Sequence, residues 1–430
     1  MKNVDIAKKY EDYVIGMRRH FHENPELPTK EVNTVKRVFD ELCAMGVECV
    51  EVENGGVLGK ICGKKDNGRA VLLRADMDAL AVQETDENLK HKRVCKSKVD
   101  GVMHACGHDG HTAMLLGAAK ILLEKQDEIE GTVYLCFERG EEGGGNCRYL
   151  LKYIEDKGIH IDSCYGIHLF SDSDIPNGVF GINDNAVMAS LMAFNVTIVG
   201  KGGHGSRPDQ ASSPIDAFVA IYNGLQAMRV TKIPPNQVLT YSLGTVQSGD
   251  THNVIPHTLK FVGTMRTFDR EGAGMIFYNE FRKLIENVCE TYGCKPVYNK
   301  YTLPGLNVMN DTECAKFARK VIGEDLGEEA IQVDARMGSE SFAQYLRLWP
   351  GAFALLGVYN EEKGVGAPNH NPYFDIDESV LYKGSASAAT YAIEFLKSDI
   401  DTSDRKIEGG YRAVLELAGK DDFLKELYGE

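Results

Sequence analysis

The densest group of chemically capable side chains lies in one short segment. Residues 103–111 (MHACGHDGH) hold one cysteine and three histidines, and Cys106 is two residues from His108. Thiolate and imidazole are ligands that borderline-soft divalent ions such as Zn²⁺ prefer. The same segment could instead form a polar helix cap around one buried thiol, since cysteine is often simply buried. Taken alone, the segment leaves both interpretations open.

Two adjacent carboxylates add a potential ligand and a potential base. Glu141 and Glu142 follow an apolar run at residues 132–137 that predicts a strand. Open α/β sheets place their ligand sites at the carboxyl ends of strands. Because neighbouring side chains point in different directions, one carboxylate can bind a metal while the other faces the water that the metal activates. For an isolated Glu-Glu-Gly, a solvated acidic turn is the alternative.

Two further histidines occupy comparable positions. His168 follows an apolar run at residues 164–167, and His370 follows another at 353–358. A single histidine at a strand end is more often a packed or hydrogen-bonded residue. The convergence of all these groups on strand ends and loops nevertheless favours a shared metal site.

Short apolar runs alternate with helical stretches and would position these groups. Helical periodicity covers residues 4–45, with a break at Asn24-Pro25, and residues 111–124. Four runs predict buried strands: residues 71–73, 133–137, 165–167 and 353–356. This alternation predicts an α/β fold with a mostly parallel, mixed sheet flanked by helices.

The pattern changes to that of an α+β unit between about residues 189 and 302, and the first pattern then resumes. We therefore expect a discontinuous metal-binding catalytic domain at residues 1–188 and 303–430, with a smaller domain inserted at residues 189–302. The acidic tail at 400–430 is expected to form helices that pack on the catalytic domain.

Composition restricts the class of protein. The 430 residues include 48 Lys+Arg and 63 Asp+Glu, and the net charge of -15 disfavours binding to nucleic acid or to acidic membranes. The 11 cysteines show no closely spaced framework, which favours free thiols in a reducing compartment. No apolar segment has the length of a signal-peptide core or of a membrane span. We therefore expect a cytoplasmic protein with no nucleic-acid or membrane partner.

Several segments, taken in order, resemble the two-metal amidohydrolases and metallopeptidases. That family includes hippurate hydrolase, N-acyl-L-amino acid amidohydrolase and auxin-conjugate hydrolase, which are relatives of aminoacylase and the zinc carboxypeptidases. The segments are RADMDAL (74–80), MHACGHDGHTAMLLG (103–117), Glu-Glu (141–142), GGH (202–204), NVIP (253–256) and HNPYF (370–374). The resemblance extends from about residue 18 to about residue 395, so only the tail lies outside it.

The resemblance implies a set of metal ligands. Cys106 would bridge two divalent ions in each subunit, with Glu142 and His370 completing one site and His108 and His168 the other. The ions would be Zn²⁺ or Mn²⁺, with Co²⁺ and Ni²⁺ as alternatives.

The resemblance also implies catalytic and substrate-binding residues. Glu141 would be the general base, and Asp78 would orient a ligand histidine. The inserted domain would act as a dimerisation or lid domain, and its His204 would reach into the partner subunit of a homodimer to stabilise the oxyanion. Asn253 and Arg266 would lie near the substrate, with Arg266 as a clamp for a carboxylate.

The implied reaction is hydrolysis of the amide bond of N-acyl amino acids, including aromatic acyl ones, to a carboxylic acid and a free amino acid. Two metal ions would activate a water molecule, and Glu141 would accept its proton. A carboxypeptidase or dipeptidase would apply the same mechanism to short peptides.

Two alternatives belong to other classes. A hydrolase with Cys106 as nucleophile, assisted by His108 or His111, would leave Glu141 and Glu142 without a role. A catalytically silent binding protein would not need a base beside the ligands.

The residues before the acidic pair depart from the family pattern, which often has Gln-Pro-Ala where this chain has Glu138-Arg139-Gly140. Because these residues lie beside the expected pocket, this departure leaves the identity of the substrate undetermined. Arg139 could face an anionic substrate or form a surface salt bridge.

Overall fold

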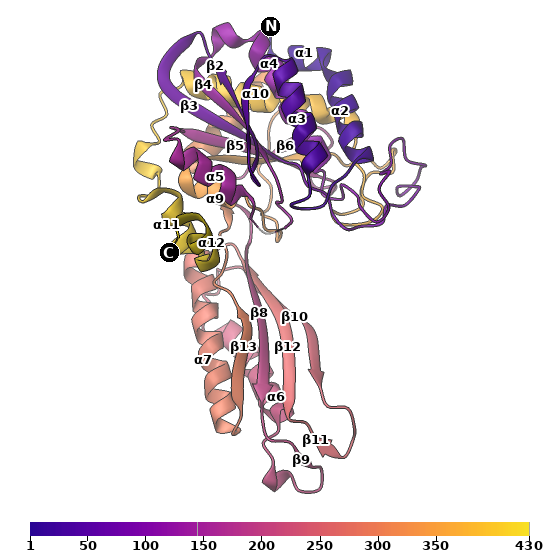
Figure 1. Ribbon diagram of the computed structural model, residues 1–430, viewed down its shortest axis with the longest axis vertical. Helices are drawn as coiled ribbons and strands as arrows, with labels where there is room; N and C mark the ends of the chain where they lie inside the picture. Colours follow the sequence, from indigo (N-terminus) through magenta and orange to yellow (C-terminus); the bar gives the residue numbers. More distant parts are fainter. Residues whose placement is uncertain (144, 430) are drawn as a thin grey trace.

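A computed structural model describes residues 1–143 and 145–429 of the chain. Gly144, which follows the predicted acidic pair, and Glu430, the last residue of the predicted tail, lie outside the described residues. Two sheets dominate the structure, a larger one surrounded by helices and a smaller one that extends away from it (Figure 1).

The larger sheet is mixed and confirms the predicted α/β class. Its strands, in spatial order, are β1 (Glu48–Val52), β2 (Gly56–Cys62), β4 (Glu130–Glu138), β3 (Lys65–Asp76), β5 (Ser163–Phe170), β15 (Gly351–Gly357) and β6 (Phe180–Gly181). The central strands β4, β3, β5 and β15 pair in parallel, while β1, β2 and β6 pair antiparallel at the edges. The central β15 is buried along its whole length, as expected for a strand covered on both faces.

Helices cover both faces of this sheet because side chains alternate along its strands. Leu73 of β3 packs into one apolar core and its neighbour Leu72 into the other. The first core contains α1 (Asn3–Lys9), α2 (Glu11–Glu23), α3 (Val32–Ala44), α4 (His108–Glu124), α8 (Thr312–Leu326) and α10 (Leu381–Lys397). The second contains α5 (Cys147–Asp156), α9 (Ala343–Leu348), α11 (Gly410–Ala418) and α12 (Asp421–Tyr428). The last two helices confirm that the tail packs on this part of the molecule.

The smaller sheet is antiparallel and has a separate apolar core. Its order is β10 (Leu239–Ser248), β12 (Thr258–Thr267), β8 (Ser190–Val199) and β13 (Lys295–Tyr301), packed with α6 (Pro214–Thr231) and α7 (Met275–Thr291). Burial alternates along β8, as expected for a strand with one covered face. The predicted domain boundaries stay a prediction, although every strand of this sheet lies within the predicted insertion.

Two short strand pairs complete the structure. At the far end of the smaller sheet, β9 (Gly203–His204) pairs with β11 (Val254–Ile255) (Figure 1). Where the chain passes between the sheets, β7 (Ala186–Met188) pairs with β14 (Val308–Met309). Short helical turns are η1 (Gln126–Glu128), η2 (Pro208–Gln210), η3 (Arg270–Gly274), η4 (Glu378–Val380) and η5 (Ser403–Arg405).

All of the cysteines are free thiols, as predicted. In residues 1–143 and 145–429, none of the helices combines the length and the apolar character that crossing a membrane requires.

Candidate active site

The candidate ligands gather at the carboxyl ends of the central parallel strands. Glu141 and Glu142 follow the end of β4, and His168 lies near the end of β5. His108 is the first residue of α4, and the preceding Gly107 has a φ of 89°, a left-handed conformation that glycine adopts without strain. This edge is where open α/β sheets place their ligands.

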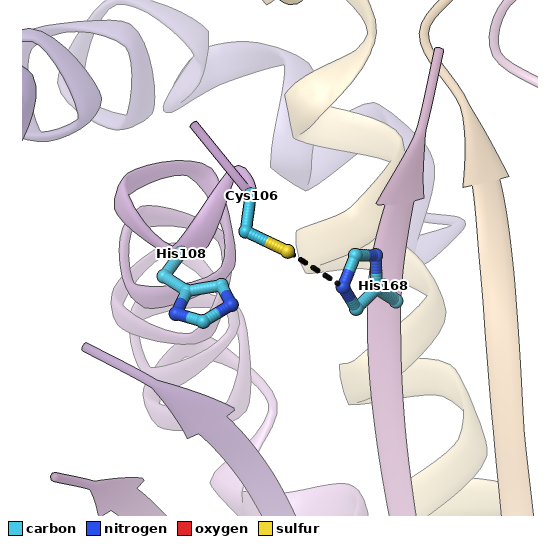
Figure 2. Close-up of side chains that lie close together, drawn as sticks. All are labelled: Cys106, His108 and His168. Carbon is cyan, nitrogen blue, oxygen red and sulfur yellow. Dashed lines mark hydrogen bonds between the residues drawn. The ribbon is translucent and has the colours of Figure 1, made fainter. Parts of the chain in front are cut away.

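Five predicted ligands form two groups that share one sulfur. The groups are Cys106 with His108 and His168, and Cys106 with Glu142 and His370. In each group the potential ligand atoms lie within 4.8 Å of one another. Cys106 Sγ is 3.5 Å from His168 Nε2, and His370 Nε2 is 2.9 Å from Glu142 Oε1. Figure 2 shows the sulfur pointing toward His168, with His108 on its other side. The structure thus brings these residues together in the predicted pairs.

The donor set fits divalent cations. His108 Nδ1 lies 3.1 Å from Asp78 Oδ1, so Asp78 can accept the Nδ1 proton and leave the lone pair on Nε2. That Nε2 atom is buried and has no hydrogen-bond partner among the described residues. A buried polar atom without a partner is costly, and a cation bound there would remove the cost. Asp78 also accepts a hydrogen bond of 2.9 Å from the backbone N–H of Glu142, so it orients both groups.

His370 has a strained backbone that aims its ring into the site. Its φ is 67°, which is uncommon for a residue other than glycine. Its N–H donates to the carbonyl of Ala105 at 2.7 Å, which ties the His370 loop to the segment that carries Cys106. Such outliers persist where the surrounding structure enforces them, and they concentrate at functional sites.

The local charges favour the thiolate form of Cys106. Burial alone would raise the pKa of this thiol, but the neighbouring His168 and His108 lower its pKa to about 6. Thiolate is the form that binds metal ions.

The surroundings of Glu141 favour its protonated form. Burial, followed by the charges of Glu340 and Glu142, holds the pKa of Glu141 well above its ordinary value. The backbone N–H of Ser341 donates to Glu141 Oε1 at 2.9 Å, which leaves Oε2 as the oxygen available to a substrate. A carboxylate with a raised pKa is suited to general acid–base work near neutral pH.

A cavity of about 380 Å³ opens over these groups. Its lining includes Cys106, Glu141, Glu142, His168 and His370, together with Arg266. Arg266 therefore lies where a substrate carboxylate could reach it, as the resemblance implies. One of its N–H groups donates to the carbonyl of Met337 at 2.8 Å, which holds the side chain toward the cavity wall.

His204 and Asn253 do not lie near the candidate metal ligands of the same subunit. They belong to the region of β9 and β11 at the far end of the smaller sheet, where Gly205 N–H donates to the Asn253 carbonyl at 2.9 Å (Figure 1). His204 is exposed. In the described part of the chain, neither residue lines the cavity over the candidate ligands. Within one subunit the structure does not bring these two residues to the other site residues.

A buried ion-pair network that includes Glu340 lies close to Glu141, and the sequence did not predict this network. Arg74 pairs with Asp76 at 2.6 Å, with Glu138 at 2.8 Å and with Glu340 at 2.9 Å. Asp76 in turn lies 2.6 Å from His111 Nδ1. Arg74 belongs to the RADMDAL segment, but only folding shows which acids it meets.

A second buried network holds the segment around His108. Asp109 Oδ2 lies 2.9 Å from Arg18 Nε and 2.7 Å from His22 Nδ1, and all three side chains are buried. The residue types around Arg18 and His22 indicated a resemblance but no role. Their role in this structure is to anchor Asp109, beside a candidate ligand.

Arg139 is part of a largely buried salt bridge. It lies 3.1 Å from the buried carboxylate of Glu31, and it also donates to the Thr29 carbonyl at 2.8 Å. Among the described residues it does not line the cavity over the candidate ligands. A salt bridge is thus present, as one alternative predicted, but it is largely buried and does not lie on the surface.

Several known proteins are similar to this chain along most of its length. The family model of Peptidase family M20/M25/M40 matches residues 72–394. Thermostable carboxypeptidase 2 of Saccharolobus solfataricus is 37% identical over 398 residues, which cover 90% of this chain and 97% of the relative. IAA-amino acid hydrolase ILR1-like 4 of Arabidopsis thaliana is 35% identical over 428 residues, 95% of this chain and 92% of the relative.

A solved structure extends the likeness to three dimensions. The YXEP protein of Bacillus subtilis, described as a dinuclear metal binding peptidase from the M20 family, superposes with a TM-score of 0.74 at 31% sequence identity. The match covers 91% of this chain and 99% of that protein.

Proposed function

Because this chain belongs to peptidase family M20/M25/M40 and is therefore a hydrolase acting on amide bonds, we propose that it cleaves N-acyl amino acids. The acyl group, aromatic ones included, leaves as a carboxylic acid, and the free amino acid is the second product. The observation that carries the proposal is a half-buried carboxylate, Glu141, beside the ligand groups that share Cys106 in a cavity that also holds Arg266.

Two divalent ions per subunit are part of the proposal, with Zn²⁺ or Mn²⁺ as first choices and Co²⁺ or Ni²⁺ as alternatives. Cys106 would hold both, His108 and His168 one, and Glu142 and His370 the other. When bound, such ions polarise the amide carbonyl and lower the pKa of a water molecule toward about 7.

The protein's own residues perform the remaining steps. Glu141 accepts the proton of the attacking water at Oε2, because Oε1 is occupied by the Ser341 N–H. Glu141 then gives this proton to the amide nitrogen, which is a poor leaving group until it is protonated. Arg266 binds the carboxylate of the amino acid, and a fork of N–H donors suits that geometry.

A carboxypeptidase or dipeptidase activity is the second candidate, favoured by the 37% identity to thermostable carboxypeptidase 2. N-Acetyl and N-benzoyl amino acids, compared with free and N-blocked dipeptides, should separate the two. We expect kcat/KM to be at least about tenfold higher for the acylated amino acids than for free dipeptides, because the two cations repel an α-ammonium group. Faster turnover of dipeptides, free or blocked, would favour the peptidase.

We also propose that a homodimer completes each site. The smaller sheet ends at the edge strand β10, and the adjacent α6 exposes Ile215, Val219 and Tyr222. An unpaired strand edge beside exposed apolar side chains suits a second copy of this chain. His204, remote from the ligands of its own subunit, would then stabilise the oxyanion in the partner's site.

Mixed dimers test this exchange of residues. Glu141→Gln and His204→Ala subunits should each be nearly inactive, whereas their co-expression should restore roughly 25% of wild-type activity. Half of the dimers are then mixed, and one of the two sites in each has an intact Glu141 and receives an intact His204. Activity is measured on the co-expressed mixture, and mixed dimers purified from it with two different tags should show roughly 50% of wild-type activity, because one of their two sites is intact.

The matched control combines Glu141→Gln with Glu142→Gln. Both residues belong to the same subunit's site, so no mixed site is intact and no activity should return. Failure of the His204→Ala mixture to exceed this control would mean that His204 does not act across subunits.

We further propose a cytoplasmic location and no nucleic-acid or membrane partner. The free cysteines suit a reducing compartment, and the net charge of -15 opposes binding to polyanions.

A further inference from the structure

A second cavity adjoins the first and is reached past Glu141. It has a volume of about 230 Å³ and shares Glu141, Ser339 and Glu340 with the cavity over the metal ligands. A substrate whose amide lies beside Glu141 can therefore extend a group into either cavity. The proposed mechanism uses only the first.

The tail of the chain forms one wall of this second cavity. Ala418, Lys420 and Phe423 line it from the region of α11 and α12, opposite Leu191 and Leu306. These tail residues follow the segment that the family model matches, which ends at residue 394. The family's common machinery therefore does not account for this wall.

Several contacts hold the wall in place. Tyr411 donates to Gln344 Oε1 at 2.9 Å, and Tyr428 donates to Glu155 Oε2 at 2.6 Å. The guanidinium of Arg148 lies 4.2 Å from the centre of the Phe423 ring. The tail is thus tied to α5 and α9 on either side of the cavity, and its side chains form a defined surface.

The charges of the cavity are unevenly distributed. Glu141 and Glu340 lie at the end shared with the first cavity, and Arg74 neutralises Glu340 at 2.9 Å. Leu191, Leu306 and Phe423 make much of the remaining lining apolar.

Among the described residues that line the second cavity, Lys420 alone carries a positive charge, and it forms no ion pair with any residue of the described chain. Its ammonium lies 5.4 Å from the centre of the Phe423 ring. Burial lowers the pKa of Lys420, and the positive charges of Lys300 and Arg148 act in the same direction. Lys420 is nevertheless exposed and therefore accessible, and an ammonium without a counter-charge gains from binding an anion.

We propose that this second cavity is the acyl subsite and that it selects acyl groups with an apolar body and a terminal carboxylate, which Lys420 binds. The inference rests on the proposed function, in which Arg266 takes the carboxylate of the amino acid in the first cavity. The acyl side of the amide then points past Glu141 toward the apolar lining and Lys420.

Paired substrates of one amino acid test the charge preference. N-Adipoyl and N-hexanoyl derivatives have chains of equal carbon number and differ in a terminal carboxylate or methyl group, and N-glutaryl and N-pentanoyl derivatives form a shorter pair. In the wild-type protein we expect kcat/KM to favour the carboxylate of the better-fitting pair by about tenfold, as for a hydrogen bond to a charged group. Lys420→Met keeps the apolar stem and should remove this preference, mainly through KM.

Lys425→Met is the matched control, because Lys425 is exposed on α12, which Lys420 immediately precedes, and does not line the cavity. It should keep the wild-type preference. Phe423→Ala should lower the ratio of hexanoyl to acetyl turnover at least about threefold, since it removes apolar surface from the acyl chain. Ratios between substrates cancel any loss of folded protein.

Results that contradict the acyl subsite differ from results that contradict the proposed function. Equal turnover of both members of each pair by the wild-type protein, or the same ratios for Lys420→Met and Lys425→Met, would overturn the acyl subsite while N-acyl amino acid hydrolysis stands. Absence of hydrolysis for every N-acyl amino acid in the metal-loaded protein would overturn the proposed function together with the subsite.

Discussion

Glu141→Gln should lower kcat for N-benzoyl amino acids by about a thousandfold while the bound metal stays in place. General base catalysis typically contributes about 10²- to 10⁴-fold, and an amide cannot accept the proton of the attacking water. Glutamine matches glutamate in size, and its carbonyl oxygen can still accept the Ser341 N–H that now binds Oε1. Steady-state kinetics and elemental analysis on the same preparation would measure both effects.

Glu142→Gln is the natural comparison because it makes the same chemical change one residue away. Glu142 Oε1 lies 2.9 Å from His370 Nε2, inside one of the two groups that share Cys106. Exchange of a carboxylate for a neutral amide weakens metal binding, so this variant should lose metal and regain part of its activity when metal is added in excess. The opposite pattern, with metal lost from Glu141→Gln and kept by Glu142→Gln, would show that the two roles are reversed.

The ligand set could be predicted because its members stand at strand ends or in a short segment with strong chemical character. Cys106 and His108 lie two residues apart at the start of α4, and the strands β4, before Glu141, and β5, which begins at Ser163, are apolar enough to be recognised. Parallel strands bring their carboxyl ends to one edge, so sequence order already implies proximity. Local signals therefore indicate the candidate ligands, whereas their pairing around Cys106 and the role of Glu141 were implied by the family resemblance.

Contacts between distant segments could not be predicted in the same way. Arg74, Glu138 and Glu340 form a buried network although nothing in their local sequence pairs them. His22 and Asp109 are a second example. Ion pairs of this kind depend on the packing of whole elements, and a single sequence contains no periodicity that reports them.

Two of the strands that were not predicted have weak apolar signals, whereas β2 was missed although most of its residues are buried. β1 (ECVEV) and β13 (KPVYNKY) are edge strands with mostly exposed or half-buried residues. Edge strands need little apolar surface and often carry charged side chains, so composition alone resembles that of a loop. The tail was also predicted only in part. Its helices were expected, but the position of Lys420 in the lining of the cavity beside Glu141 was not.

Removal of metal should abolish hydrolysis of N-acyl amino acids, and added Mn²⁺ or Zn²⁺ should restore it. Four candidate ligands, His108, Glu142, His168 and His370, lie around Cys106 Sγ, and one of their buried nitrogens, His108 Nε2, has no partner among the described residues. Without cations, the carbonyl loses its polarisation and the water its lowered pKa, which together account for several orders of magnitude in rate. Turnover is measured after dialysis against a chelator and again after titration with each metal.

The same chelator saturated with Zn²⁺ beforehand serves as the control and should leave activity unchanged. Full activity after metal removal would point instead to the Cys106 thiol, which lies 3.5 Å from His168 Nε2 and so has a potential base within reach. That outcome would leave Glu141 and Glu142 without a chemical role. Loss of activity that none of the metals reverses would likewise contradict the two-metal site, provided that the protein remains folded by circular dichroism.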